Sequence, residues 1–339
     1  MTFLKNRWYV IAWEHEIPAD GLFSRIVLGE RVLVYRTSSG EFVALADRCC
    51  HRQAPLSAGR REGDCVRCGY HGLKFDATGR CVEIPGQSRI PSKAAVRSYP
   101  TVLCNRWVMV WMGDPARADT AMLPDNFSCD HPDWRYRPGY LHYDTDYRLI
   151  CDNLLDFSHL SYVHATSLGG STEIARTAPV ITALADGVRV TRRIRNTRPS
   201  PYHLRFSSFT ADTPIDRWID YDFLLPGVLL MSSGARPCGD AEDDLSRTIH
   251  LHSCQALTPE TADSTHYFFQ EAHRSDQGDE ATTEAIYQGL LVAFEEDRQM
   301  ITAQAGNLRL QPGLPMLPLP MDGALVRFRR LLAEQLAAD

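Results

Sequence analysis

In the first third of the chain, short runs of apolar residues are separated by short polar segments. Each run of β-branched or aromatic residues is closed by a turn signal such as Ser38-Ser39-Gly40 or Ala77-Thr78-Gly79. Many short strands separated by turns are typical of a small all-β barrel or sandwich. The runs that we expect to be strands are Trp8–Trp13, Ser24–Tyr35, Glu41–Ala46, Leu73–Phe75, Cys81–Ile84 and Asn105–Pro115.

The pattern changes after a stretch rich in Pro, Ala and Asp that spans residues 114–133, which we interpret as a linker. It becomes helical from Tyr147, and a helix is predicted over Ala281–Ala305, ended by Gly306-Asn307. Another helix is expected from about Gly323. Between the helical segment at Tyr147 and the helix at 281–305 we expect an antiparallel sheet, with strands in Thr182–Arg195, Tyr202–Phe209, Trp218–Leu225, Leu229–Ser233, Thr248–Leu257 and Thr265–Glu271. The expected class is α+β, with an all-β domain at 1–115 and a second domain at 116–339.

Composition is compatible with this division. The chain has 339 residues, enough for two hydrophobic cores, and it is 44% hydrophobic and 23% charged. Its formal net charge of −6 argues against a nucleic acid partner. No apolar run approaches a membrane span or a signal peptide, so we expect no membrane association. Ten cysteines without an export signal favour a reduced, cytoplasmic setting.

The segment from Cys49 to His71 holds two Cys-and-His pairs. They are Cys49-x-His51 and, further on, Cys68-x-x-His71. Two thiolates and two imidazoles form the ligand set of a Rieske [2Fe–2S] cluster, in which two Cys bind one iron and two His bind the other. The sequence therefore predicts a centre that accepts single electrons.

Two alternatives compete for this segment. Cys65-x-x-Cys68 is also half of a zinc site, with Cys50 as a further spare thiol, but such a site would need a second matching pair. Buried structural Cys and His residues are the other alternative. Gly69 and Gly72 favour the cluster, because they let the backbone approach inorganic sulfides.

A second group of metal-binding residues lies in the sequence DNLLDFSHLSYVH, which contains Asp152, Asn153, Asp156, His159 and His164. At about 100° per residue, the two histidines lie about 140° apart on one straight helix. The helix must therefore end or kink between them if both bind one ion. Two histidines and one carboxylate form the facial triad of non-haem Fe(II) oxygenases, so one more carboxylate is needed.

The helix predicted over 281–305 offers that carboxylate. Its apolar stripe contains Ile286, Leu290 and Phe294, and Asp297 falls within the stripe, at about 20° from Ile286. A carboxylate on an apolar face is costly unless it is paired or bound to a metal. Arg298 is the alternative partner, in a plain salt bridge.

Together these motifs resemble the oxygenase components of Rieske non-haem iron oxygenases. RCCHRQAPLS, CVRCGYHGLKF, WVMVWMGDP, DNLLDFSHLSYVH and IYQGLLVAFEEDRQMI look like the subgroup containing vanillate O-demethylase, dicamba monooxygenase and toluenesulfonate methyl-monooxygenase. The resemblance implies a Rieske domain followed by a helix-grip catalytic domain. It also implies that Cys49, His51, Cys68 and His71 hold the cluster, and that His159, His164 and Asp297 hold a mononuclear Fe(II).

Two further roles follow from the resemblance alone. Asp156 matches the carboxylate that links a cluster histidine of one subunit, here His71, to an iron histidine of the next, here His159. This implies a head-to-tail homotrimer. Asn153 matches a polar residue close to the iron.

The resemblance implies a terminal monooxygenase that uses O₂ to hydroxylate a methyl or methoxy group of an anionic aromatic compound. The chain has no dinucleotide fingerprint and no flavin motif, so we expect a separate NAD(P)H-dependent reductase that carries flavin and an iron–sulfur centre. Ring cis-dihydroxylation and a non-catalytic Rieske electron carrier are the alternatives.

The substrate pocket is less well marked. By rough alignment with the same subgroup, Met231 and His250 fall at pocket positions. His250 shares one strand face with His252, since side chains alternate along a strand. An inward face would let a histidine bind a carboxylate or sulfonate. The alternative is that this face is exposed.

Overall fold

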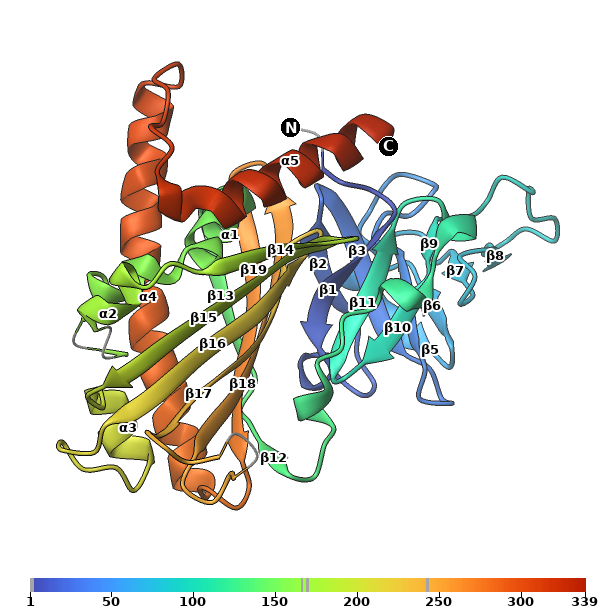
Figure 1. The fold of residues 1–339 in the computed structure, drawn as a ribbon. Helices are drawn as coiled ribbons and strands as arrows, with labels where there is room; N and C mark the ends of the chain where they lie inside the picture. The colour runs from blue at the N-terminus through green and yellow to red at the C-terminus, as the bar shows by residue number, and fades with distance from the viewer. Residues whose placement is uncertain (1–2, 166, 169–170, 242–243) are drawn as a thin grey trace. The chain divides into compact units, whose positions relative to one another are not determined.

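The computed structural model describes residues 3–165, 167–168, 171–241 and 244–339. The chain forms two compact units, which are described separately (Figure 1). The first comprises Met1–Leu123 and Thr258–Ala262, and the second comprises Pro124–Leu257 and Asp263–Asp339. The first is all-β and the second combines a sheet with helices, as the predicted class requires.

The first unit contains one three-stranded and two four-stranded antiparallel sheets. The first sheet has the order β1-β11-β10, with β1 (Arg7–Trp13), β10 (Thr101–Cys104) and β11 (Trp107–Met112). The second has the order β2-β3-β4-β9, with β2 (Phe23–Val27), β3 (Glu30–Arg36), β4 (Phe42–Ala46) and β9 (Ser98–Tyr99). The third has the order β5-β6-β7-β8, with β5 (Arg60–Glu62), β6 (Cys65–Arg67), β7 (Lys74–Phe75) and β8 (Cys81–Glu83).

The core of this unit includes the aromatic and β-branched residues of β1 and β11. Every residue of both strands is buried. The run predicted as one strand over Ser24–Tyr35 is a hairpin instead. Leu28 and Gly29 both have positive φ, at 52° and 77°, which is the backbone conformation of a two-residue hairpin turn.

The second unit is built on a large antiparallel sheet, whose order is β12-β19-β18-β17-β16-β15-β14 and in which β13 also pairs with β19. Its strands are β12 (Trp134–Arg135), β13 (Gly139–Tyr143), β14 (Val180–Leu184), β15 (Gly187–Thr197), β16 (Ile215–Leu224), β17 (Val228–Pro237), β18 (Ile249–Thr261) and β19 (Ser264–Arg274). Burial alternates residue by residue along β16, so one face of the sheet is directed at the core.

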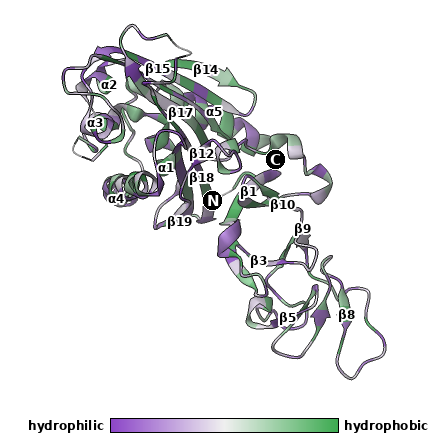
Figure 2. Cartoon of the chain, turned by 90° about the horizontal axis from the view of Figure 1, so that it is seen from below, coloured by the Kyte–Doolittle hydropathy of each residue, from purple (hydrophilic) through white to green (hydrophobic). Residues whose placement is uncertain are grey.

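Helices cover that face in Figure 1. They are α1 (Tyr147–Leu155), α2 (Thr172–Arg176), α3 (Pro201–Phe206), α4 (Glu280–Leu310) and α5 (Gly323–Ala338). Helix α4, seen nearly end-on in Figure 2, carries both hydrophobic and hydrophilic residues. Its buried residues include Ile286, Leu290, Phe294 and Ile301, which is the predicted stripe, and Asp297 is buried among them.

In the second unit, three predicted elements differ from the structure. The run 182–195 belongs to a hairpin of β14 and β15, turned at residues 185–186. Tyr202–Phe209 was predicted as a strand, but α3 occupies it, because Ser200 is an N-cap and Pro201 fits the first helical position. Helix α4 continues through Gly306 and ends at Leu310, although a glycine costs roughly 1 kcal/mol in a helix.

Candidate metal centres

Two loops of the first unit present the Cys-and-His pairs, and they are closed in the same way. The amide of Cys49 donates to the carbonyl of Ala54, and the amide of Gln53 donates back to the carbonyl of Cys49, at 2.8 and 2.9 Å. In the second loop, the amide of Cys68 donates to Leu73 at 2.8 Å, and that of Gly72 donates to Cys68 at 3.1 Å. Two matching loops thus offer one thiol and one imidazole each.

The cysteines and histidines of these loops differ in exposure. Cys49 and Cys68 are each 2% exposed and belong to the core that includes Leu33, Leu56 and Phe75. His51 and His71 are exposed, with ring centroids 4.6 Å apart. Two inner thiols and two outer imidazoles fit a cluster whose cysteine-bound iron is buried and whose histidine-bound iron lies at the surface.

Glycines let the two loops approach each other. A Cβ on Gly59 would lie 2.0 Å from the carbonyl oxygen of Arg67, and one on Gly69 would lie 2.7 Å from that of Ala58. Gly72 has a φ of +75°, where glycine is favoured. Gly59 and Gly69 therefore let the backbones of the two loops pack together. From the sequence, we expected the glycines only to let the backbone approach inorganic sulfides.

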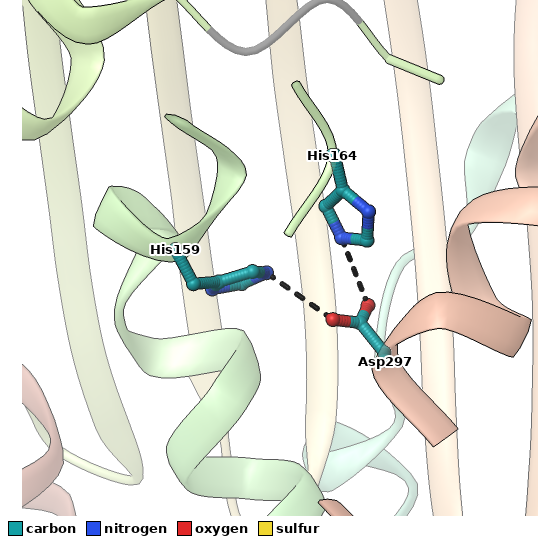
Figure 3. A group of neighbouring side chains, drawn as sticks. All are labelled: His159, His164 and Asp297. Atoms are coloured by element: carbon teal, nitrogen blue, oxygen red, sulfur yellow. Dashed lines mark ion pairs between the residues drawn. The ribbon is translucent and has the colours of Figure 1, made fainter. Parts of the chain in front are cut away.

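His159, His164 and Asp297 meet in the second unit. One ligand atom from each lies within 4.8 Å of the others. Nε2 of His159 is 3.5 Å from Oδ1 of Asp297, and Nε2 of His164 is 3.2 Å from Oδ2 (Figure 3). Helix α1 ends at Leu155, before both histidines. His159 lies in the 3₁₀ turn η6 (Phe157–Ser161), which ends before His164, so the predicted break between the two histidines is present.

The outer nitrogen of each histidine is already engaged. Nδ1–H of His159 donates to the backbone carbonyl of Asp156 at 2.6 Å. Nδ1–H of His164 donates to Oε2 of Glu296 at 2.8 Å, and Ser167 Oγ donates to the same oxygen at 2.6 Å. Because Nδ1 carries the proton, the lone pair of each Nε2 is directed at Asp297, which is the tautomer a metal requires.

Asp297 is also held by a hydrogen bond from a neutral amide. It is 5% exposed, and Asn153 Nδ2 donates to its Oδ1 at 3.0 Å. Arg298, the alternative salt-bridge partner, bonds to Glu295 instead, at 2.7 Å. A buried carboxylate between two histidines and without a cationic partner from Arg or Lys among the described residues has the chemistry of a metal ligand.

The pKa values of the two histidines are shifted in opposite directions. Burial lowers the pKa of His159, and the charge of Asp297 opposes this only in part. Burial also acts to lower the pKa of His164, but hydrogen bonds and charges from Asp297 and Glu296 outweigh it and raise that pKa. The charge of Asp297 thus acts on both imidazoles.

Asp156 caps the turn that carries His159. Its carboxylate accepts from the amide of Ser158 at 2.9 Å and from Ser158 Oγ at 2.6 Å. Its side chain is half-buried. Glu296, the partner of His164, was not identified from the sequence. Its position next to Asp297 on α4 was the one signal that could have identified it.

A cavity adjoins this triad and is lined by all three residues together with Asn153 and Met231. Most of its other lining is aliphatic or aromatic. Its wall includes Leu154, Phe157, Leu160, Ile219, Ile249, Leu251, Leu290 and Phe294. A mostly apolar cavity with a few polar groups beside a metal-binding triad has the features of a site for a small aromatic molecule.

His250 does not line this cavity, so its predicted place in the pocket is wrong. On β18 the lining residues are Ile249, Leu251, Ser253 and Gln255, and alternation directs His250 to the other face. There its ring packs against Trp134, at 5.2 Å, and its Nε2 bonds to Ser232 Oγ at 2.9 Å. That face is not freely exposed either, because an aromatic cluster covers it.

Comparison with known proteins agrees with both centres. Residues 7–100 match the Rieske [2Fe-2S] domain, and residues 143–338 match the vanillate O-demethylase oxygenase C-terminal domain. The iron-sulfur subunit TsaM1 of the toluene-4-sulfonate monooxygenase system of Comamonas testosteroni is 48% identical, over 99% of this chain and 98% of its own. Dicamba monooxygenase bound to 3,6-dichlorosalicylic acid matches with a TM-score of 0.93 at 30% identity, over 100% and 99% of the two chains.

A structure of dicamba monooxygenase with non-heme iron and dicamba also matches, with a TM-score of 0.80 at 28% identity over 100% and 98% of the two chains. The fold and the two centres define a Rieske non-haem iron oxygenase. The chain belongs to the family of Rieske oxygenase components that carry the vanillate O-demethylase type of catalytic domain. Its cofactors are a Rieske [2Fe–2S] cluster and a mononuclear non-haem iron, which excludes the zinc alternative.

In the part of the chain that the structure describes, no helix is both long enough and apolar enough to span a membrane.

Proposed function

We propose that this protein is the terminal oxygenase of a multicomponent monooxygenase and hydroxylates a methyl or methoxy group of an anionic aromatic compound. The observation that carries the proposal is the triad of His159, His164 and Asp297 at the wall of an apolar cavity, in a chain that also holds a Rieske domain. Relatives named for toluene-4-sulfonate and vanillate support the substrate class.

The residue roles are part of the proposal. Cys49 and Cys68 hold the buried iron of the cluster, and His51 and His71 hold the exposed one. His159, His164 and Asp297 bind the mononuclear iron. When bound, the two centres supply single electrons and activation of O₂.

The chain's own side chains prepare this site. The carbonyl of Asp156 and the carboxylate of Glu296 keep the protons of His159 and His164 on Nδ1. Asn153 fixes one carboxylate oxygen of Asp297. The apolar wall excludes water and orients an aromatic ring. Hydroxylation of a methoxy carbon gives a hemiacetal that collapses to a phenol and formaldehyde, whereas an aryl methyl group gives a benzylic alcohol.

The electron donor is proposed to be a separate NAD(P)H-dependent reductase with flavin and an iron–sulfur centre. The relative from Comamonas testosteroni is named as one subunit of a system, which supports this division of labour. Purified protein and aromatic substrate alone are expected not to consume NADH. Substrate-dependent NADH oxidation without a reductase would contradict it.

A head-to-tail homotrimer completes the proposal, with Asp156 linking His71 of one subunit to His159 of the next. Its support is the exposure of His71 and the half-buried position of Asp156, whose backbone carbonyl already contacts His159. Sedimentation of the holoenzyme should give a mass about threefold that of one chain; a monomer that turns over would overturn it.

Product profiling distinguishes the candidate reactions. With a compatible reductase, toluenesulfonate and methoxybenzoates should yield benzylic alcohol or phenol with formaldehyde. Unsubstituted benzoates should yield nothing. A cis-diol from a ring would favour dihydroxylation, and the absence of any product from the whole panel would contradict the proposal.

A further inference from the structure

One buried arginine lies on the apolar face of strand β16. The buried positions of that strand are Ile215, Arg217, Ile219, Tyr221 and Phe223. Arg217 is 9% exposed. Its register neighbours on the two adjoining strands are Ile194 and Ala235, which are both apolar. A guanidinium in such surroundings is unfavourable unless an anion pairs with it.

The described residues do not provide that anion. Nη1 of Arg217 donates to Ser171 Oγ, but this hydrogen bond is long, at 3.4 Å. A guanidinium has five N–H donors, so most of its capacity is left over. The charge of Glu173 acts on Arg217, but the described residues form no ion pair with it. Burial lowers the pKa of Arg217 to about 10, which leaves it charged at neutral pH.

Arg217 also lines the cavity beside the iron-binding triad. The other ionisable groups described on this wall, apart from the triad, are His203, Tyr202 and Glu271. Burial lowers the pKa of His203 to about 3 and raises that of Glu271 to about 7, while the phenol of Tyr202 has its pKa raised well above the usual value. Arg217 is therefore the fixed positive charge of the described cavity wall at neutral pH.

We propose that Arg217 binds the sulfonate or carboxylate of the aromatic substrate and makes the enzyme select anions over neutral arenes. The planar guanidinium can bond two oxygens of either group at once. The apolar wall then receives the ring, and the anion at one end leaves a substituent elsewhere on the ring free to face the triad. This inference rests on the proposed function, because it concerns the same cavity.

Binding measured by calorimetry on the holoenzyme tests it without turnover. The probes are toluene-4-sulfonate and 4-methylbenzoate, each paired with its neutral amide of nearly the same shape. Wild-type protein should prefer at least one anion over its amide by roughly 100-fold, as expected for a buried charge-assisted pair. Arg217→Gln should abolish that preference, while binding of the amide stays within about threefold.

Two further variants control the measurement. Arg217→Lys retains the charge but loses the fork, so it should keep a preference of roughly 10-fold. It also serves if the Gln variant does not fold. Arg192→Gln removes another buried arginine, on neighbouring β15, that is 4% exposed and does not line the cavity. It should leave the preference unchanged.

The outcomes separate the two proposals. An equal affinity of wild-type protein for anions and amides, or an unchanged preference in Arg217→Gln, would overturn the role of Arg217 even if methyl groups are oxidised. A preference that depends on Arg217, in a protein that oxidises none of these compounds, would support the anion site and overturn the proposed reaction.

Discussion

Glu296 lets the contribution of one hydrogen bond to iron binding be measured. It accepts Nδ1–H of His164, whereas its neighbour Glu295 bonds to Arg298 at the surface of the same helix. Loss of such an outer partner typically lowers metal affinity by about 10- to 100-fold. Glu296→Gln should therefore lose mononuclear iron to a chelator that wild-type protein resists, with its cluster spectrum unchanged.

Glu295→Gln is the matched control, since it removes a carboxylate one residue away that does not contact either histidine. It should retain iron as the wild-type protein does. Equal iron retention by both variants would show that His164 does not depend on Glu296.

Glu271 should make stability depend on pH. It is buried in the second unit, where burial raises its pKa to about 7 from an ordinary value of 4.5. Between these two values the folded state holds a proton that the unfolded state has lost, so the free energy of unfolding falls as pH rises. The full loss, above pH 7, is about 3 kcal/mol.

Glu271→Gln cannot ionise and should remove this dependence. Relative to wild-type protein, its Tm should rise by several degrees more at pH 8 than at pH 5, as measured by thermal unfolding followed by circular dichroism. The same Tm difference at both pH values would contradict the raised pKa.

His250 is expected to matter for stability and not for substrate binding. It packs between Trp134 and Trp218 and bonds to Ser232, on the sheet face away from the cavity. Burial lowers the pKa of His250 to about 4, so its imidazole is neutral at neutral pH. His250→Ala should lower the free energy of unfolding by about 2 kcal/mol and leave KM within twofold. A large rise in KM with an unchanged Tm would contradict this and would show that His250 contributes to substrate binding.

At the scale of elements, helical periodicity was the most informative pattern. It placed Asp297 within the apolar stripe of α4, and the structure buries Asp297 with Ile286 and Phe294. A helix fixes which side chains share a face, and a charged residue on the apolar face must be explained by a partner. For this reason the carboxylate could be found from the sequence, although it lies far from both histidines along the chain.

Alternation along β18 carried less information. It correctly put His250 and His252 on one face, but it could not say which face meets the helices. That choice depends on packing, which seats Leu251 and Ser253 on the cavity side. Arg217 was missed because the strand was predicted to begin at Trp218, whereas β16 begins at Ile215 and includes Arg217 on its buried face.

Local turn chemistry explains the elements that were wrong. Residues 202–209 are rich in aromatic residues, yet the Ser200-Pro201 pair begins a helix there. Leu28 and Gly29 divide one apolar run into two strands through their positive φ. In both places one or two residues override the propensity of the run that surrounds them.

At the scale of the whole molecule, electrons must travel from the cluster to the iron. Asp156→Asn tests the proposed route through a neighbouring subunit. Asn still offers an oxygen to the amide of Ser158, so the cap of the turn that carries His159 is kept while the charge is lost. Turnover should fall by more than about tenfold, with the cluster still reducible and the iron still bound. Normal turnover would show that Asp156 only caps the turn and is not needed for electron transfer between subunits.

Isotope labelling with ¹⁸O₂ tests most directly whether the protein is a methyl-directed monooxygenase. The holoenzyme, a compatible reductase and NADH are supplied with toluene-4-sulfonate. The mass of the product, measured by mass spectrometry, gives the number of ¹⁸O atoms that it contains. The proposed function predicts a benzylic alcohol with a single ¹⁸O atom, which comes from O₂ and not from water. A ring diol that carries two labelled atoms, or an alcohol whose oxygen comes from water, would contradict it.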